Sequence, residues 1–125
     1  MTNKKGQATA EGLTATIIDA IQDKKGSNIT LMDLKELDGS VTDYFIICEG
    51  NSTPQIDAIK DSIEKKVRED LGEKAWHVEG TANMEWVLLD YVNVVVHIFK
   101  HEIREFYNLE GLWADANVTE IEASN

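Results

Sequence analysis

Two histidines, His97 and His101, lie four residues apart, a spacing that places two imidazoles on one metal ion when the segment is helical. His97, however, falls in a run typical of a strand, where four residues span about 13 Å at ~3.3 Å per residue. No cysteine lies nearby in the sequence, and there is no HExxH motif. We therefore expect neither a metal site nor a metal cofactor here.

Cys48 is the single cysteine of the 125 residues, so an internal disulfide is excluded. It lies in the continuous apolar run 44–48, where a buried thiol is inert and is not a nucleophile. No Ser-His-Asp arrangement and no glycine-rich phosphate loop can be identified from spacing. Because the N-terminal lysines are not followed by an apolar stretch, we expect no secretion signal and a cytoplasmic location.

Gly39 and Ser40, ahead of Asp43, are similar to the start of a nucleotidyltransferase signature. Such enzymes need two nearby carboxylates on a strand to hold a divalent metal beside the triphosphate. Here Tyr44 and Phe45 follow Asp43, so the second carboxylate is missing. The sequence therefore predicts a turn before a core strand and no enzyme activity. An enzyme acting on a nucleotide substrate stays as the alternative.

A different kind of site is indicated by Trp86, Leu88 and Asp90, which share one face of a predicted strand because side chains alternate. Tryptophan is enriched at interface hot spots, since it buries a large rigid area and carries one polar handle. The opposite face, with Val87 and Leu89, already supplies a core side. The face bearing Trp86 must then be covered by a helix or by a partner, and periodicity favours neither.

The elements that position these residues follow from hydrophobic periodicity. Helices are predicted at residues 8–23, at 54–71 and at 102–109, the last with Ile103, Phe106 and Leu109 facing inward. Strands are predicted at 29–34, 44–48, 75–79, 85–91 and 93–99. Strands that alternate with helices and end in a hairpin predict an α/β fold: a mixed five-stranded sheet flanked by helices. We expect a single domain over residues 1–113 and an acidic, disordered tail over 114–125.

Charge restricts the partners. The chain has 12 lysines and arginines against 23 acidic residues, a formal net charge of -11. Residues 75–99 contain no lysine or arginine, yet they include Glu79, Glu85 and Asp90. A protein that binds phosphate groups needs a surface rich in lysine and arginine, so direct binding to nucleic acid or to an anionic membrane is not expected. The electrostatics favour a basic protein partner.

Two blocks of residues carry a family pattern. The first is Thr42-Asp43-Tyr44-Phe45-Ile46-Ile47-Cys48 followed by Gly50-Asn51-Ser52. The second comprises Val78-Glu79-Gly80, Trp86, Asp90, Val94-Val95-Val96-His97, Arg104, Tyr107, Leu109 and Leu112-Trp113. Together, in this order and at this spacing over residues 8–113, they resemble the Iojap family of ribosomal silencing factors. One departure is Val92-Asn93, where the family usually has Gly-Asp.

The resemblance implies a fold related to nucleotidyltransferases but without their active site, and no cofactor. It also implies binding to the large ribosomal subunit through large-subunit ribosomal protein fourteen, at the face where the small subunit would dock. Subunit joining would then be blocked and translation repressed. A homodimer is similarly implied. The contact residues carried over are Trp86, Asp90 and His97, followed by Glu79 and Tyr91.

Overall fold

The computed structural model describes residues 9–37, 39–40 and 42–121. Within these residues a single mixed sheet has six strands in the order β3-β4-β5-β2-β1-β6, of which β2 and β5 are parallel and the other neighbours antiparallel. The elements are α1 (Ala10–Asp23), β1 (Ser27–Asp33), β2 (Tyr44–Gly50), α2 (Thr53–Leu71), β3 (His77–Glu79), β4 (Trp86–Asp90), β5 (Val94–Lys100), α3 (His101–Tyr107), α4 (Leu109–Leu112) and β6 (Asn117–Ile121). The predicted mixed α/β architecture is confirmed.

Both long helices begin and end where the sequence places capping residues. The Thr9 side chain accepts a hydrogen bond from the Gly12 amide at the start of α1, and Ser52 accepts one from Gln55 at the start of α2. Gly72 ends α2 in the left-handed conformation, with φ 69°. No helix in the described ranges is both long and apolar enough to cross a membrane.

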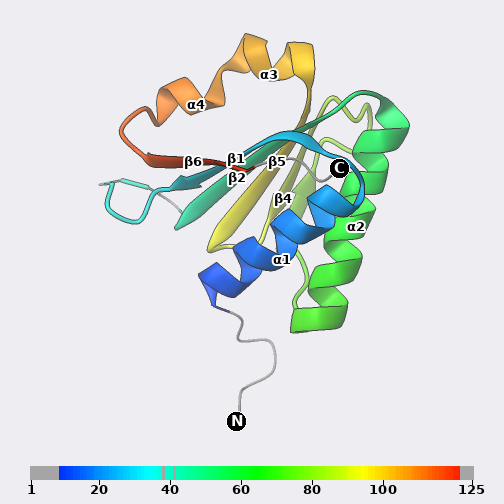
Figure 1. The fold of residues 1–125 in the computed structure, drawn as a ribbon, viewed down its shortest axis with the longest axis horizontal. Coiled ribbons are helices and arrows are strands. Elements are labelled where there is room, and N and C mark those ends of the chain that lie inside the picture. Colours follow the sequence, from blue (N-terminus) through cyan, green and yellow to red (C-terminus); the bar gives the residue numbers. More distant parts are fainter. Residues whose placement is uncertain (1–8, 38, 41, 122–125) are drawn as a thin grey trace.

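The sheet has two faces of different character (Figure 1). The first face packs against α1 and α2, and it carries Val87 and Leu89 of β4 into the main core. The second face is crossed by α3 and α4, which cover only part of it. Strand register places these side chains on the second face: His77, Glu79, Trp86, Leu88, Asp90, Val95, His97, Phe99, Phe45, Ile47, Glu49, Thr30 and Met32.

The prediction of five strands is wrong, since the described sheet has six, and the expected disordered tail over 114–125 does not hold for Asn117–Ile121, which form strand β6. Strand β6 pairs antiparallel with β1, from Ile29 opposite Ile121 to Asp33 opposite Asn117, so the domain extends beyond residue 113. The strand escaped detection because its side chains are nearly all exposed. An edge strand needs backbone hydrogen bonds from its neighbour, and these require no apolar pattern. Residues 122–125 of the expected tail lie outside the described residues.

The last predicted helix is also corrected. It is two short helices, α3 and α4, divided at Asn108, whose φ is 47°. Leu109 is buried and Ile103 packs partly against the second face, whereas Phe106, expected inward, is 78% exposed. The side chain that α3 buries is the charged Arg104. The break at Asn108 lets Leu109 pack inward from the separate helix α4, whereas within α3 the residues turned toward the sheet are Ile103 and Arg104 and not Phe106.

Val92 adopts a φ of 76° in the tight turn between β4 and β5. A β-branched residue is strained in the left-handed region, which glycine occupies freely. Val92→Gly is therefore expected to raise the free energy of unfolding by about 1 kcal/mol, measured by urea denaturation. Val118→Gly is the control, since Val118 is similarly exposed but lies in strand β6 with no positive φ; it should destabilise. Equal destabilisation by both changes would show that Val92 is unstrained.

Candidate functional site

The second face is only half covered. Beneath α3 and α4 it is closed, with Met32, Phe45, Ile47 and Phe99 all buried. Toward β3 and β4 it opens, and Trp86, Leu88 and Asp90 are each half-buried. Helices α3 and α4 therefore cover one half of this face, and no helix or strand of the described residues covers the other half. We call the open half, formed by Glu79, Trp86, Leu88, Asp90 and Val95, the open face.

Trp86 is held at the border between the two halves. Its indole stacks on Phe99 at a centroid distance of 4.9 Å and meets Tyr107 of α3 at 4.7 Å. Its Nε1 donates a hydrogen bond to Nδ1 of His97 over 3.1 Å. The backbone before it is fixed by close approach: at Gly80, φ is 87° and a Cβ would lie 1.9 Å from the Trp86 carbonyl oxygen. Trp86 is therefore a rigid aromatic with one part of its surface still exposed.

His97 supports this ring from below and is not itself a surface residue. It is 4% exposed, and burial lowers the pKa of its imidazole to about 4, so it is neutral near pH 7. Because Nδ1 accepts the Trp86 hydrogen bond, Nε2 carries the proton, and it finds no partner among the described residues. In the described part of the chain no group of three or more potential metal-binding side chains occurs.

The other predicted contact residues divide between the two faces. Glu79 is exposed on the open face, opposite Leu88. Asp90 is half-buried, and its Oδ1 accepts the Val92 amide at 2.7 Å, which stabilises the β4–β5 turn. Tyr91 lies in the core of the first face, where burial raises the pKa of its hydroxyl. The structure thus brings Glu79, Trp86 and Asp90 together, with His97 beneath them, and separates Tyr91 from them.

Trp76 is the prominent residue that sequence reasoning missed. It was placed in a predicted strand, but it precedes β3 and is 78% exposed. Its backbone amide donates to the Asp90 carbonyl oxygen over 2.7 Å, which positions it beside the β4–β5 turn. Together with Asp90, Val92 and Val95 it lines a hollow of about 370 Å³ at the end of the open face. The sequence feature that could have identified it is a tryptophan just before a short strand, in a segment without the apolar alternation that would predict burial of its ring.

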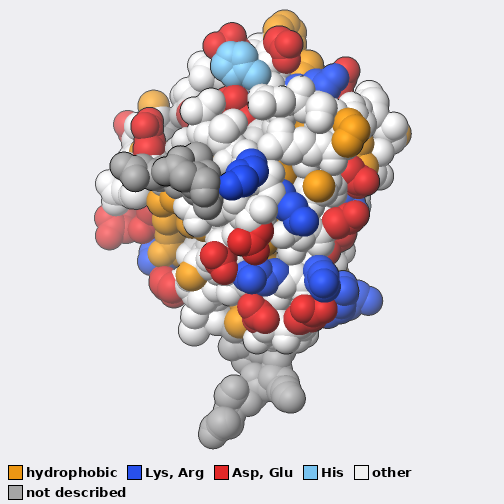
Figure 2. Space-filling model, turned by 45° about the vertical axis from the view of Figure 1, so that its right-hand side comes forward, with side chains coloured by type: hydrophobic (Ala, Val, Ile, Leu, Met, Phe, Trp, Pro, Cys, Tyr) orange, Lys and Arg blue, Asp and Glu red, His pale blue; other side chains and the backbone are white. Residues whose placement is uncertain are grey.

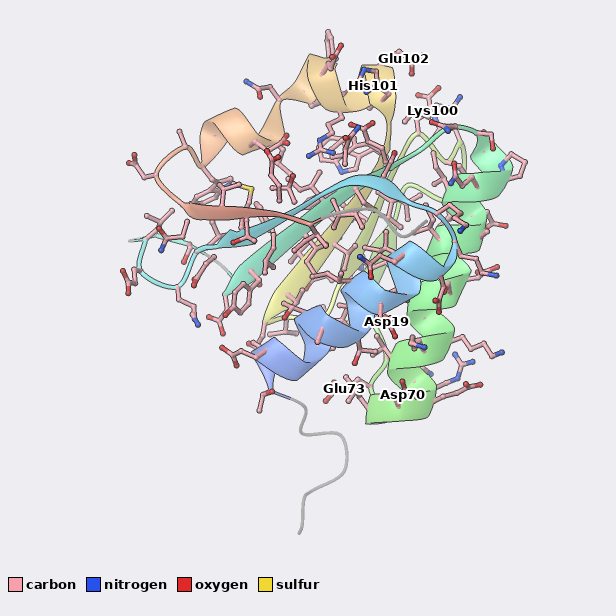
Figure 3. All side chains as sticks on the ribbon, in the orientation of Figure 1. Asp19, Asp70, Glu73, Lys100, His101 and Glu102 are labelled. Atoms are coloured by element: carbon pink, nitrogen blue, oxygen red, sulfur yellow. The ribbon has the colours of Figure 1, made fainter. Side chains whose placement is uncertain are left out.

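A buried charge cluster anchors α3 at the opposite end of the strands. The Arg104 guanidinium pairs with Glu49 at 3.2 Å and with Glu110 at 2.6 Å, and it donates to Thr30 Oγ1 and to the Asn28 carbonyl oxygen. Figure 3 shows His101 and Lys100 at this end, where β5 meets α3. A hollow of about 710 Å³ adjoins the cluster. Since these charges pair with one another, they explain the attachment of α3 and do not indicate a ligand.

His101 gives the stability a pH dependence. Its Nδ1 lies 3.0 Å from Glu49 Oε1 and its Nε2 lies 3.3 Å from Glu105; the hydrogen bond and charge of Glu49, followed by the charge of Glu105, raise the pKa of the imidazole. The stabilisation is therefore complete below the unfolded-state pKa of about 6.5 and is lost as pH rises through the folded-state pKa. We expect His101→Gln to destabilise the protein at pH 6 and to have a smaller effect at pH 9, measured by urea unfolding. A difference independent of pH would contradict this.

Charged side chains elsewhere are distributed differently. Over α1 and α2, lysines and arginines lie among carboxylates (Figure 2), and Lys66, for example, contacts Asp19 at 3.4 Å and Asp23 at 3.7 Å. Such exposed pairs largely neutralise one another. Strands β3 and β4 contain no lysine or arginine, and the basic side chain beside the open face on these strands is His77, whose Nε2 lies 2.5 Å from Glu79 Oε2.

Comparison with known proteins gives one consistent result. The sequence model of a family described as "Ribosomal silencing factor during starvation" matches residues 7–125. A ribosomal silencing factor of Halalkalibacterium halodurans is 39% identical over 105 residues, covering 84% of this chain and 88% of that protein. The chloroplastic protein Iojap of Zea mays is 41% identical over 83 residues, 64% of this chain and 34% of that protein.

Solved structures agree in fold. A crystal structure of a Chromobacterium violaceum protein superposes with a TM-score of 0.81 at 32% identity, covering 86% of this chain and 88% of that one. A crystal structure of a Bacillus halodurans protein gives a TM-score of 0.77 at 35% identity, covering 89% of this chain and 99% of that one. The arrangement of strands and helices is therefore shared with these proteins.

Proposed function

The chain belongs to the ribosomal silencing factor family, and we propose that it binds the large ribosomal subunit through the open face and prevents the small subunit from joining. Family membership supports a role in ribosome silencing, which is regulatory and not enzymatic. The binding partner, the blocked step and the surface that performs it are our proposal. We further propose that it acts in the cytoplasm and that it self-associates as a homodimer.

The observation that carries the proposal is the half-covered second face. Trp86 is fixed by Phe99, Tyr107 and His97, yet part of it stays exposed. A preorganised aromatic in a patch with few mobile groups is what binding hot spots consist of, because little side-chain entropy is lost on association. Asp90 and Glu79 border it, so the complementary partner surface is basic.

Large-subunit ribosomal protein fourteen, implied by the resemblance, is the proposed partner. Trp86 would be the central anchor, with Asp90 and Glu79 at the rim. His97 would act from beneath by holding the indole. Tyr91 drops out of the proposed contact set, since it belongs to the core of the first face. The alternative of a nucleotidyltransferase-like enzyme gains no support, because Tyr44 and Phe45 occupy the strand after Asp43.

The test uses purified ribosomal subunits and the wild-type chain. Added in excess before the subunits are mixed, the protein should shift sucrose-gradient profiles from joined ribosomes to separate subunits and should sediment with the large one. A profile unchanged by excess folded protein would overturn the proposed function. Co-sedimentation without loss of joined ribosomes would overturn the blocking step alone.

A further inference from the structure

The hollow at the end of the open face combines an exposed aromatic ring with a fixed carboxylate. Trp76 forms one wall, the valines 92 and 95 contribute apolar surface, and Asp90 supplies the charge. Trp76 and Asp90 are joined by the hydrogen bond from the Trp76 amide to the Asp90 carbonyl oxygen. The backbone of Trp76 is therefore placed beside Asp90, and the Val92 amide orients the Asp90 carboxylate, before any partner arrives.

The Asp90 carboxylate is oriented but not neutralised. Its Oδ1 accepts the Val92 amide over 2.7 Å, and no described residue forms a hydrogen bond or ion pair with Oδ2. Residues 75–99 contain no lysine or arginine that could approach it along these strands. An acceptor held in place beside apolar walls favours a charged donor, since covering it with an apolar group would leave it buried and unpaired.

Trp76 favours the same occupant. Its ring is 78% exposed, and a tryptophan face attracts a cation by its quadrupole. A planar guanidinium can stack on the indole while donating to a carboxylate at its edge, which an ammonium does less well. A phosphate is repelled by Asp90. The hollow thus combines the two features that recognise arginine.

We propose that this hollow receives an arginine side chain of the protein partner, and that Trp76 and Asp90 together determine the specificity of docking. The inference rests on the proposed function, because it names the chemistry that the partner presents to one end of the open face. It adds a residue, Trp76, that the family resemblance does not include.

The first experiment measures binding of isolated large subunits to Trp76→Leu, Asp90→Asn and the double variant. Asparagine keeps an acceptor for the Val92 amide while it removes the charge, and leucine keeps an apolar wall while it removes the ring. Each single change should weaken binding about tenfold, and the double change by much less than a hundredfold, because both residues contact one cation. Phe106→Leu is the matched control, equally exposed at 78% but on α3, and should stay within about twofold. Wild-type affinity in both single variants, in a protein that binds, would overturn the inference and leave the proposed function standing.

The second experiment needs no ribosome. An acetylated arginine tripeptide is titrated into the free protein while the indole N–H resonances of the tryptophans are followed by NMR. The Trp76 resonance should shift more than that of Trp113, the shift should be lost in Asp90→Asn, and a glutamate tripeptide should produce none. A Trp76 resonance that does not move would overturn the inference, whether or not the protein binds large subunits. Failure to bind large subunits would overturn the proposed function and is a separate result.

Discussion

Arg104→Met is expected to lower the free energy of unfolding by about 3–5 kcal/mol, the range found when one partner of a buried ion pair is removed. The side chains of Arg104 and Glu49 are only 9% and 7% exposed, so water cannot replace the lost partner. Methionine fills a similar volume, so the main cost is the loss of the guanidinium by two carboxylates, Glu49 and Glu110, of which Glu49 keeps only its contacts with His101 and Asn28 among the described residues. The Asn28 carbonyl oxygen also loses the donor that Arg104 provides at 2.6 Å.

Urea unfolding of Arg104→Met, Glu49→Gln and the double variant measures this. The double variant should be more stable than the sum of the single losses predicts, because residue 49 then carries no charge that Arg104 would have to compensate. Glu110 loses its partner in Arg104→Met and in the double variant alike. Lys66→Met is the control: its ion pairs with Asp19 and Asp23 lie at the surface, where water screens them, so this change is expected to affect stability far less than Arg104→Met. A loss below about 1 kcal/mol for Arg104→Met would show that the Arg104 cluster is well solvated.

The cluster also shows where sequence reasoning on the fold ends. Local signals predicted α1 and α2 well, since capping residues and helical periodicity are encoded within a few positions, as at Ser52 and Gly72. The attachment of α3 is not local. Arg104 bonds to residues on β1 and β2 that lie 76 and 55 positions away, namely Asn28 and Glu49. Arg104 is therefore turned inward in α3, whereas Phe106, which periodicity predicted to face inward, is exposed.

Strand β6 was missed for a related reason. Its residues are exposed and polar, so neither alternation nor composition distinguishes them from a tail. Their pairing depends on the free edge of β1, to which the chain returns only after crossing α3 and α4. Edge strands of this kind are determined by the backbone of a distant neighbour and not by their own pattern.

The candidate site could be predicted from the sequence where its residues lie on a regular β-strand, because side chains there alternate between the two faces. Alternation placed Trp86, Leu88 and Asp90 on one face, and the register confirms it. The same alternation could not predict that His97 is buried, because its burial comes from the rings of Phe45 and Trp86 around it. Trp76 could not be assigned at all, since its place depends on one backbone hydrogen bond from a loop to Asp90.

Trp86→Ala is expected to reduce the affinity for the large subunit by roughly thirtyfold, about 2 kcal/mol, if the exposed part of the indole anchors the interface. The change removes the ring stacked on Phe99 and the donor to His97, so it also destabilises the free protein by about 2 kcal/mol. The two effects must be separated, because a partly unfolded protein binds less.

Ile63→Ala supplies the comparison. Ile63 is fully buried in α2 beneath the first face, and its truncation is expected to cost about 2–4 kcal/mol without altering the open face. Affinity for isolated large subunits and the folded fraction are measured for both variants at a temperature where each is folded. If Trp86→Ala loses thirtyfold while Ile63→Ala binds as the wild type does, the indole contributes binding energy directly. Equal affinities for the two variants would remove Trp86 from the interface and restrict it to the role of a core residue.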